Sequence, residues 1–302
     1  MASLTTPAMR ILCEEMGCGL TFTEMVSTAG LVHGARKVAA LLASSSPGRA
    51  FGAQLIGHRV EEMERAALMA EASGAALVDI NMGCPARKVV KSGGGAALMR
   101  DSDLAVSLVA AVRRGTSLPV TVKIRAGWDQ DSVNAPEFAQ AMVEAGAAAV
   151  TVHGRTKRQV FSGPVDFDCI AAVVDAVDVP VIGNGGIVDV SSAEQMVRAT
   201  GCAGIMVARG ALGRPWIFGE LAAWWRGDPM PEPPDADRIR DLMVRHLDLY
   251  LAEASADRAV LEMRKHLAWY ARGVIGASTF RRALFQLTDP EAVRRHIATF
   301  GR

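Results

Sequence analysis

Short apolar runs alternate with longer segments in which apolar residues recur at helical spacing. Such an alternation of strand and amphipathic-helix patterns is typical of repeated βα units. We predict strands at residues 20–25, 51–55, 77–81, 120–124, 148–152, 180–184 and 204–207. We predict helices at residues 6–16, 59–73, 103–113, 135–145 and 191–199. The strands are short and apolar on both faces, as expected when helices cover one face and a barrel core fills the other.

The number of strands decides between two α/β architectures. A TIM (β/α)8-type barrel needs eight strands, and the helix at residues 6–16 has no strand before it. A doubly wound sheet would remove this deficit, but no Gly-x-Gly-x-x-Gly follows an early strand. We therefore predict a TIM-type barrel whose first strand is absent, which leaves an unpaired edge in the sheet.

The pattern changes after residue 218. The prolines at 229, 231, 233 and 234 cannot continue a helix, so they predict a linker at residues 226–237. Beyond it, residues 238–254, 258–272, 278–287 and 291–298 show helical spacing without a strand pattern. The sequence thus predicts a barrel domain at residues 1–225 and a small helical domain at residues 238–302.

Composition limits the class of protein but does not identify a partner. The formal net charge is +1, so global charge does not indicate nucleic acid. No apolar run reaches the roughly 18 residues of a membrane span, and no signal peptide opens the chain. Five scattered cysteines argue against a disulfide framework, and Cys13 and Cys18 lack a second ligand pair for zinc. We expect a cytoplasmic monomer without metal.

Polar residues gather at the ends of the predicted strands, where the chemistry of a barrel is found. They are Gln54, Asp79, Asn81, Lys123, Arg125, His153, Arg155, Asn184 and Arg209. A single buried Lys or His is more often structural than catalytic, but a set at the same end of successive strands favours a site. Glycines at 185, 186 and 210 allow backbone N–H groups to approach an anion, which favours a phosphate site after the last two strands.

Cys84 is the strongest candidate for catalysis. It follows a strand end in a Gly-Cys-Pro turn, and a cysteine thiol is ordinarily protonated at neutral pH, so it can act as an acid. Arg87, Lys88 and Lys91 follow it beside Gly93-Gly94-Gly95, which predicts a mobile, positive loop. Arg155, Lys157 and Arg158 form a second cationic loop. Together these loops suit a polyanion from which one base enters the site.

The sequence resembles the tRNA-dihydrouridine synthase family, specifically its bacterial B-type branch, from about Thr5 to the C-terminus. Five segments carry this resemblance. They are Asp79-Ile-Asn-Met-Gly-Cys-Pro85, Val122-Lys-Ile-Arg-Ala-Gly-Trp128, Val152-His-Gly-Arg-Thr156, Gly213-Arg-Pro-Trp-Ile-Phe218 with the preceding Arg209, and Arg264-Lys-His-Leu-Ala-Trp-Tyr270.

The resemblance implies an FMN-dependent reduction of tRNA uridine to dihydrouridine, with NADPH reducing the flavin first. It implies that Cys84 protonates C5 of the uracil while hydride from the reduced flavin reaches C6. The implied FMN contacts are Gln54, Lys123 and His153, with Asn184, Gly185, Gly186, Ala208, Arg209 and Gly210 at the phosphate. The implied tRNA contacts include Asn81 and Arg125 beside the base, and Arg264, Lys265 and His266 in the helical tail.

The sequence departs from the family in two places, and three other functions are compatible with it. Family members begin with a strand that carries an Ala-Pro-Met-Ala-Gly type motif, and they usually have Asp where this chain has Gly186. A related flavin barrel acting on a free pyrimidine is one alternative, although the cationic loops and helical tail favour tRNA. A tRNA-binding protein without flavin is a second, and a phosphate-sugar barrel enzyme in which Cys84 has no role is a third.

Overall fold

The computed structural model describes residues 1–42 and 48–301, and the chain forms two compact units. The first unit comprises Met1–Thr6 and Leu20–Ala208, and the second comprises Pro7–Gly19 and Arg209–Arg302. This grouping places helices α1 (Pro7–Glu15) and α10 (Ile217–Arg226) with the C-terminal helices. This grouping reflects which residues pack together and does not test where the predicted domains begin and end. The boundaries at residues 225 and 238 therefore stay a prediction.

The first unit is built on a parallel β-sheet with the strand order β1-β3-β4-β5-β6-β7-β8, in which β2 also pairs with β3. The strands are β1 (Thr21–Phe22), β2 (Val26–Ser27), β3 (Phe51–Ile56), β4 (Leu77–Asn81), β5 (Val120–Arg125), β6 (Ala149–His153), β7 (Val181–Asn184) and β8 (Gly204–Met206). The predicted strands are therefore present. The one expected at residues 20–25 is instead two short strands, and both lie along β3.

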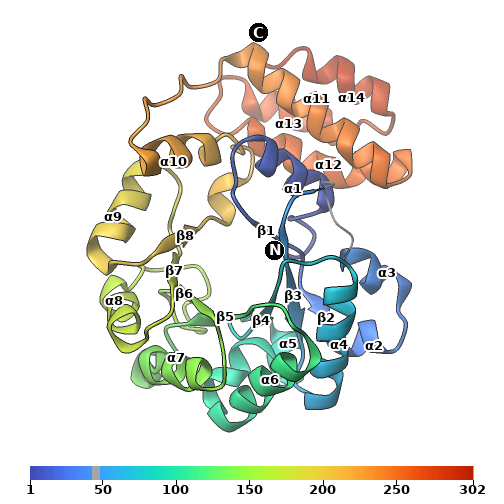
Figure 1. Cartoon of the computed structure of the whole chain (residues 1–302). Helices are drawn as coiled ribbons and strands as arrows, with labels where there is room; N and C mark the ends of the chain where they lie inside the picture. The colour runs from blue at the N-terminus through green and yellow to red at the C-terminus, as the bar shows by residue number, and fades with distance from the viewer. Residues whose placement is uncertain (43–47, 302) are drawn as a thin grey trace. The chain divides into compact units, whose positions relative to one another are not determined.

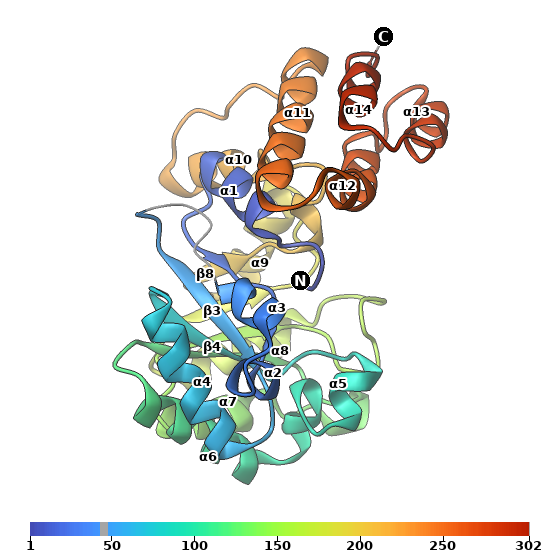
Figure 2. The ribbon, with the colours of Figure 1, turned by 90° about the vertical axis from the view of Figure 1, so that its right-hand side faces the viewer.

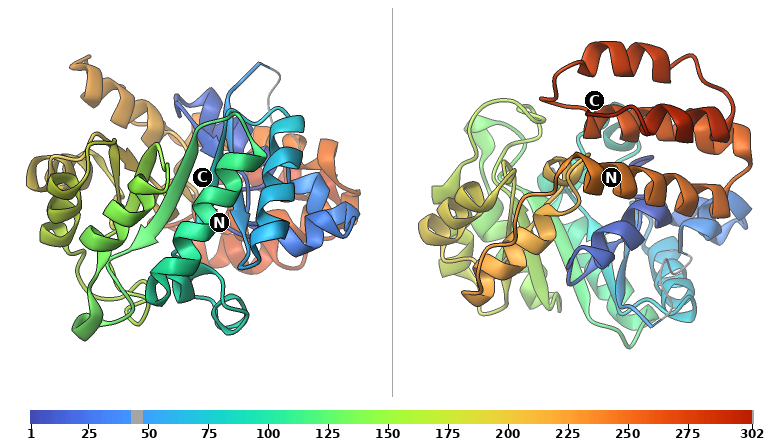
Figure 3. Two further views of the ribbon diagram at one scale, coloured as in Figure 1. Left: turned by 60° about the horizontal axis from the view of Figure 1, so that its bottom comes forward. Right: turned by 90° about the horizontal axis from the view of Figure 1, so that it is seen from above.

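Helices cover the outer face of this sheet (Figures 1 and 3). The main ones are α4 (Val60–Ala72), α6 (Ser102–Gly115), α7 (Ala135–Glu144), α8 (Phe167–Ala176) and α9 (Val190–Thr200). Consecutive members pack on one another, and α6 begins where the Asp101 side chain accepts a hydrogen bond from the Leu104 N–H. Shorter helices are α2 (Thr28–Val32), α3 (Arg36–Ala39) and α5 (Arg87–Lys91), with 3-10 turns η1 (Ala40–Leu42), η2 (Gly95–Arg100), η3 (Gln130–Ser132) and η4 (Arg209–Ala211).

The sheet is an open half-barrel within the described residues. β1 and β8 are the two ends of the strand path and are not hydrogen-bonded to each other. The side chains of β8 are only half-buried, whereas those of β4 and β5 are mostly buried. The architecture, a parallel sheet of barrel type with surrounding helices, confirms the predicted fold class.

Apolar and polar side chains alternate along β4, β5 and β6. The even-numbered residues are fully buried and apolar: Val78, Ile80, Val122, Ile124, Val150 and Val152. Most of the odd-numbered residues are polar, among them Asp79, Asn81, Thr121, Lys123, Thr151 and His153, and the apolar ones are Leu77 and Ala149. Because successive strand residues point to opposite faces, one face packs against the helices and the other gathers polar groups. The expectation that both faces are apolar was wrong for these strands.

The second unit is helical (Figures 2 and 3). Besides α1 and α10 it contains α11 (Ala236–Glu253), α12 (Ala256–Tyr270), α13 (Ala277–Leu284) and α14 (Pro290–Ile297). Leu12, Met243, Leu247, Met263 and Leu267 are fully buried in its core. Residues 227–235 form neither helix nor strand, as their prolines predicted. Among the described residues, no helix is both long and apolar enough to cross a membrane.

Candidate active site at the strand ends

A buried carboxylate lies among the polar strand residues. The side chain of Asp79 on β4 is fully buried and accepts two hydrogen bonds of 2.7 Å, from Gln54 Nε2 and from Thr121 Oγ1. The strand register explains this contact, because Gln54 of β3 and Thr121 of β5 are the direct neighbours of Asp79. Burial raises the pKa of Asp79 to about 6, although both hydrogen bonds and the charge of Lys123 act in the opposite direction.

Two side-chain amides connect this carboxylate to the cysteine turn. Asn81 Nδ2 donates to Gln54 Oε1 at 2.9 Å. The other end of the Asn81 amide, Oδ1, accepts from the backbone N–H groups of Cys84 at 2.8 Å and Gly83 at 3.2 Å. A line of hydrogen bonds therefore runs from Asp79 to the backbone of Cys84.

The turn that contains Cys84 is also held through its carbonyl groups. Arg125 Nε donates to the Gly83 carbonyl at 2.6 Å, and the Ala96 N–H donates to the Cys84 carbonyl at 3.0 Å. Gly95 packs so closely that a Cβ there would lie 2.7 Å from the Cys84 carbonyl oxygen. The half-buried thiol thus sits on a fixed backbone.

Lys123 lies on β5 beside the amide of Asn184 on β7. Its Nζ donates to Asn184 Oδ1 at 2.7 Å, and Asn184 Nδ2 donates to the Met206 carbonyl on β8, also at 2.7 Å. Burial lowers the pKa of Lys123 to about 8, opposed by the charge of Asp79. Through Lys123 and Asn184, these two hydrogen bonds connect β5 to β7 and β7 to β8.

His153 ends β6 and is buried next to Arg155. The two side chains approach to 3.4 Å between His153 Nε2 and Arg155 Nη1, and Arg155 Nε donates to the Gly163 carbonyl at 2.9 Å. The ring of the exposed Phe161 lies 6.5 Å from the His153 ring, centre to centre. Arg155 was predicted to belong to an exposed cationic rim, but its side chain is buried and holds the loop after β6.

Arg125 acts as a clamp between two loops. Besides Gly83, its guanidinium binds the carbonyl groups of Thr156 at 3.0 Å and Val160 at 2.9 Å through Nη1. Burial lowers its pKa to about 10, so it remains charged at neutral pH. The sequence suggested that Arg125 recognises the base, whereas the structure shows it bound to backbone carbonyls.

The glycine turn after β7 leaves two backbone donors available. Gly185 and Gly186 have φ values of 120° and 72°, which favour glycine, and a Cβ at Gly185 would lie 2.7 Å from the His153 ring. Within the described residues their N–H groups have no hydrogen-bond partner. The next helix, α9, begins at a cap in which the Asp189 carboxylate accepts a hydrogen bond from the Ser192 N–H. Ala208 ends the first unit, and Arg209 and Gly210 begin the second in the turn η4.

The cations after Cys84 lie on a short helix rather than on a mobile loop. Arg87, Lys88 and Lys91 are exposed on α5. Trp128, which the sequence suggested only as part of a motif, has the Arg100 guanidinium 4.8 Å and the Lys157 ammonium 4.3 Å from its ring centre. Arg158 forms an exposed ion pair with Asp129 at 3.3 Å.

The three predicted tRNA contacts of the second unit differ in position. His266 is 1% exposed and packs against His246, which corrects its assignment, because a buried side chain does not reach a polyanion. Arg264 is half-buried and donates to the Leu287 carbonyl at 2.6 Å. Lys265 is half-buried and pairs with Glu262.

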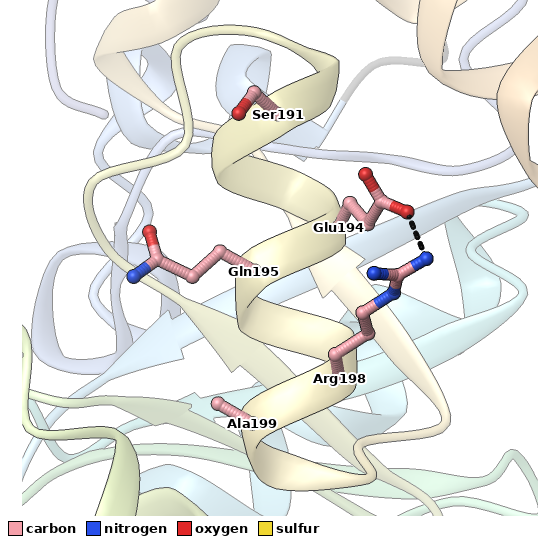
Figure 4. Close-up of a pocket in the computed structure, with 5 residues that line it drawn as sticks. All are labelled: Ser191, Glu194, Gln195, Arg198 and Ala199. Atoms are coloured by element: carbon pink, nitrogen blue, oxygen red, sulfur yellow. Dashed lines mark ion pairs between the residues drawn. The ribbon is translucent and has the colours of Figure 1, made fainter.

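A hollow of about 520 Å³ lies elsewhere, on one face of α9 (Figure 4). Its described lining is Ser191, Glu194, Gln195, Arg198 and Ala199. Glu194 and Arg198 pair with each other at 2.7 Å, and none of the predicted site residues lines it. The polar strand ends, not this hollow, hold the groups that can carry chemistry. No group of three or more His, Cys, Asp or Glu residues within the described part of the chain could hold a metal ion.

Comparisons with known proteins match this site and fold. The model of the family described as dihydrouridine synthase (Dus) matches residues 1–300. The chain belongs to the dihydrouridine synthase family. It is therefore an enzyme, an oxidoreductase, as the motifs around Cys84 and Lys123 predicted.

Relatives cover nearly the whole chain. It is 38% identical over 292 residues to tRNA-dihydrouridine synthase B of Xanthomonas campestris, a match that covers 97% of this chain and 88% of that protein. It is 39% identical over 293 residues to a probable tRNA-dihydrouridine synthase of Rhodobacter capsulatus, covering 97% and 90%. Among solved structures, histamine dehydrogenase from Rhizobium sp. 4-9 superposes with a TM-score of 0.53 at 14% identity, covering 81% of this chain and 47% of that one. This likeness supports the barrel-type fold.

Two residues that the sequence interpretation left without a role are central to the geometry. Asp79 was predicted to lie among the polar residues at the strand ends but received no role, and Thr121 was not considered. The signal that reveals them is the polar alternation inside β4 and β5, where a buried strand face should be apolar. Gly95 was taken as part of a mobile loop, whereas its contact with Cys84 is visible only in three dimensions.

Proposed function

We propose that this dihydrouridine synthase reduces specific uridines of tRNA to 5,6-dihydrouridine, with bound FMN, with NADPH as the reductant and with Cys84 as the proton donor. The observation that carries the proposal is the anchoring of Cys84. The backbone N–H and carbonyl groups of Gly83 and Cys84 all have partners outside the turn, so the thiol is held in place beside the polar strand ends.

The residues at the strand ends fit FMN. Lys123, Gln54 and His153 offer the cation and the hydrogen-bonding groups that suit the carbonyl-rich ring, and the free N–H groups of Gly185 and Gly186 suit a phosphate. Asn184, which precedes the two glycines, accepts a hydrogen bond from Lys123 and so connects the residues proposed for the ring with those proposed for the phosphate. Ala208, the last residue of the first unit, belongs to the same proposed phosphate end, whereas Arg209 and Gly210 stay contacts implied by the family resemblance alone. When bound, FMN that NADPH has reduced supplies the hydride that adds to C6 of the uracil.

The chain itself supplies the proton. The Cys84 thiol gives its proton to C5, which leaves a thiolate that regains a proton from solvent. Asn81 lies between Gln54 and the cysteine turn, next to the place where the base would enter.

The proposed tRNA contacts follow from exposure. Arg87, Lys88 and Lys91 of α5 are exposed close to Cys84 in sequence and suit phosphate groups. Arg155 and Arg125 are buried and bind backbone carbonyl groups, so they hold the loops of the site and are not proposed as tRNA contacts. Arg264 and Lys265 remain proposed contacts in the second unit, and a cytoplasmic location and a monomeric state belong to the same proposal.

The experiment has two steps that separate the alternatives. The visible spectrum of the purified protein is recorded before and after NADPH is added without oxygen, and a flavin band that bleaches is expected. The reduced protein is then given unmodified tRNA, free uridine or uracil in parallel, and dihydrouridine is measured by mass spectrometry of the released nucleosides. Product from tRNA alone supports the proposal. Product from the free pyrimidine favours the small-substrate enzyme, and a colourless protein that still binds tRNA favours the binding module.

A further inference from the structure

We propose that Asp79 is a positioning residue: its carboxylate sets the orientation of the Gln54 and Asn81 amides and, through them, holds the turn that carries Cys84. The inference deepens the proposed function, since it concerns how the proposed proton donor is held. It stands on a continuous path of hydrogen bonds from 2.7 to 2.9 Å from Asp79 Oδ2 to the Cys84 N–H.

The groups at the two ends of this path determine which way the two side-chain amides face. A carboxylate only accepts hydrogen bonds, so Gln54 must turn its NH2 group toward Asp79 and its oxygen toward Asn81. At the other end, the N–H groups of Gly83 and Cys84 only donate, so Asn81 must present its oxygen to them. Flipping either amide would place two donors or two acceptors face to face. Each end therefore supports the orientation that the other requires.

Burial makes the orientation matter. Asp79 is fully buried, and Gln54 and Asn81 are each 7% exposed, so water does not readily replace a lost partner. A buried polar group that loses its hydrogen bond has a substantial free-energy penalty. The second acceptor oxygen of Asp79 is held by Thr121 Oγ1, outside the path, which leaves Oδ2 for Gln54.

A different role for Asp79 is that of counter-charge to Lys123, whose ammonium it influences. The two roles separate in one pair of variants. Asp79→Asn removes the charge, but its side-chain oxygen can still accept from Gln54 while its NH2 group donates to Thr121. Asp79→Leu removes both the charge and the acceptor. Positioning predicts that Asn preserves the cysteine turn and Leu does not, whereas a purely electrostatic role predicts that both variants change alike.

The test measures the turn directly, in the purified full-length protein. Hydrogen exchange of the peptide that contains residues 81–84 is followed by mass spectrometry, together with the rate at which iodoacetamide alkylates Cys84. For Asp79→Leu we expect exchange of the Cys84 amide to become faster by on the order of tenfold, the loss typical of one buried hydrogen bond. For Asp79→Asn we expect both rates within about twofold of the unchanged protein. Thr121→Val, which removes the hydrogen bond outside the path, is the matched control and should also leave both rates near those of the unchanged protein.

Equal exchange and alkylation rates in Asp79→Leu and the unchanged protein would overturn the inference, as would equal changes in the Leu and Asn variants. If Asp79→Leu does not fold, Gln54→Met interrupts the same path while keeping the carboxylate, and it should give the same faster exchange. Unchanged exchange there would likewise overturn it. Neither measurement needs tRNA or turnover, so a failure of the proposed function would appear separately, as a protein with an ordered turn but no dihydrouridine product.

Discussion

Arg125 donates a hydrogen bond of 2.6 Å to the carbonyl group of Gly83, the residue that precedes Cys84. The same guanidinium binds two carbonyl groups of the loop after β6, at Thr156 and Val160. Val160 has a φ of 53°, an unfavourable value for a β-branched residue, so the surrounding contacts must hold it there. One side chain of β5 thus determines the positions of two loops at the site.

Replacing Arg125 should loosen both loops. Arg125→Met leaves three backbone carbonyl groups without their donor, and we expect the free energy of unfolding to fall by about 3 kcal/mol. Limited proteolysis should cut residues 156–163 faster. Arg158→Met is the control, because its exposed ion pair with Asp129 is worth less than about 1 kcal/mol. Equal rates of proteolysis in the two variants would show that Arg125 does not hold the two loops in place.

Removing the thiol should separate cofactor binding from catalysis. We expect Cys84→Ala to keep the flavin band and its reduction by NADPH, but to lose dihydrouridine formation by roughly 100-fold or more, as for a missing general acid. Cys18→Ala, at a half-buried cysteine of the second unit, should leave both unchanged. Loss of the flavin from Cys84→Ala would contradict the assignment of Cys84 as proton donor.

The glycine that packs on Cys84 offers a test of how closely the turn is held. A Cβ at Gly95 would meet the Cys84 carbonyl oxygen at 2.7 Å and Val89 Cγ1 at 2.8 Å. Gly95→Ala should therefore displace the turn and reduce turnover about tenfold or more, since a small misplacement of a reacting group is costly. Gly93→Ala also requires a positive φ, but its nearest neighbour would be 3.6 Å away, so it controls for backbone strain alone. Similar turnover in the two variants would argue against the close contact.

The buried His246–His266 pair should make the protein less stable in mild acid. Burial lowers the pKa of His266 to about 3 and that of His246 well below its usual value, and the rings lie 4.8 Å apart. The unfolded chain takes up protons below about pH 6.5 while the folded pair stays neutral, so each histidine makes stability fall with decreasing pH, with a slope that approaches about 1.4 kcal/mol per pH unit well below pH 6.5.

Thermal unfolding between pH 7.5 and 5.5 measures this dependence. His266→Phe should reduce the contribution of the histidine pair to the acid slope by roughly half, because one of its two groups no longer titrates. His33→Gln, at an exposed histidine of the first unit, is the control and should leave the slope unchanged. An unaltered slope in His266→Phe would mean that other groups cause the acid sensitivity.

Much of the fold followed from the sequence pattern. Six of the seven predicted strands lie within one or two residues of their observed bounds, and the helices of the C-terminal tail do so within three. These elements are long or regular enough for local periodicity to define them. The exceptions are short segments whose structure depends on neighbours. The strand expected at residues 20–25 divides because both halves pair with β3, and residues 87–91 form a helix where glycines suggested a mobile loop.

The sequence by itself determined the family, the order of the elements and the place of Cys84 at a strand end, because motifs and periodicity are local properties of the chain. Only the tertiary structure decided what the polar side chains contact. It placed His266 in a core and directed Arg125 and Arg155 to backbone carbonyls. It also joined Asp79, Gln54 and Asn81 into one path. Hydrogen-bond partners come from strands far apart in sequence, and their pairing depends on the register of the sheet, which no local pattern specifies.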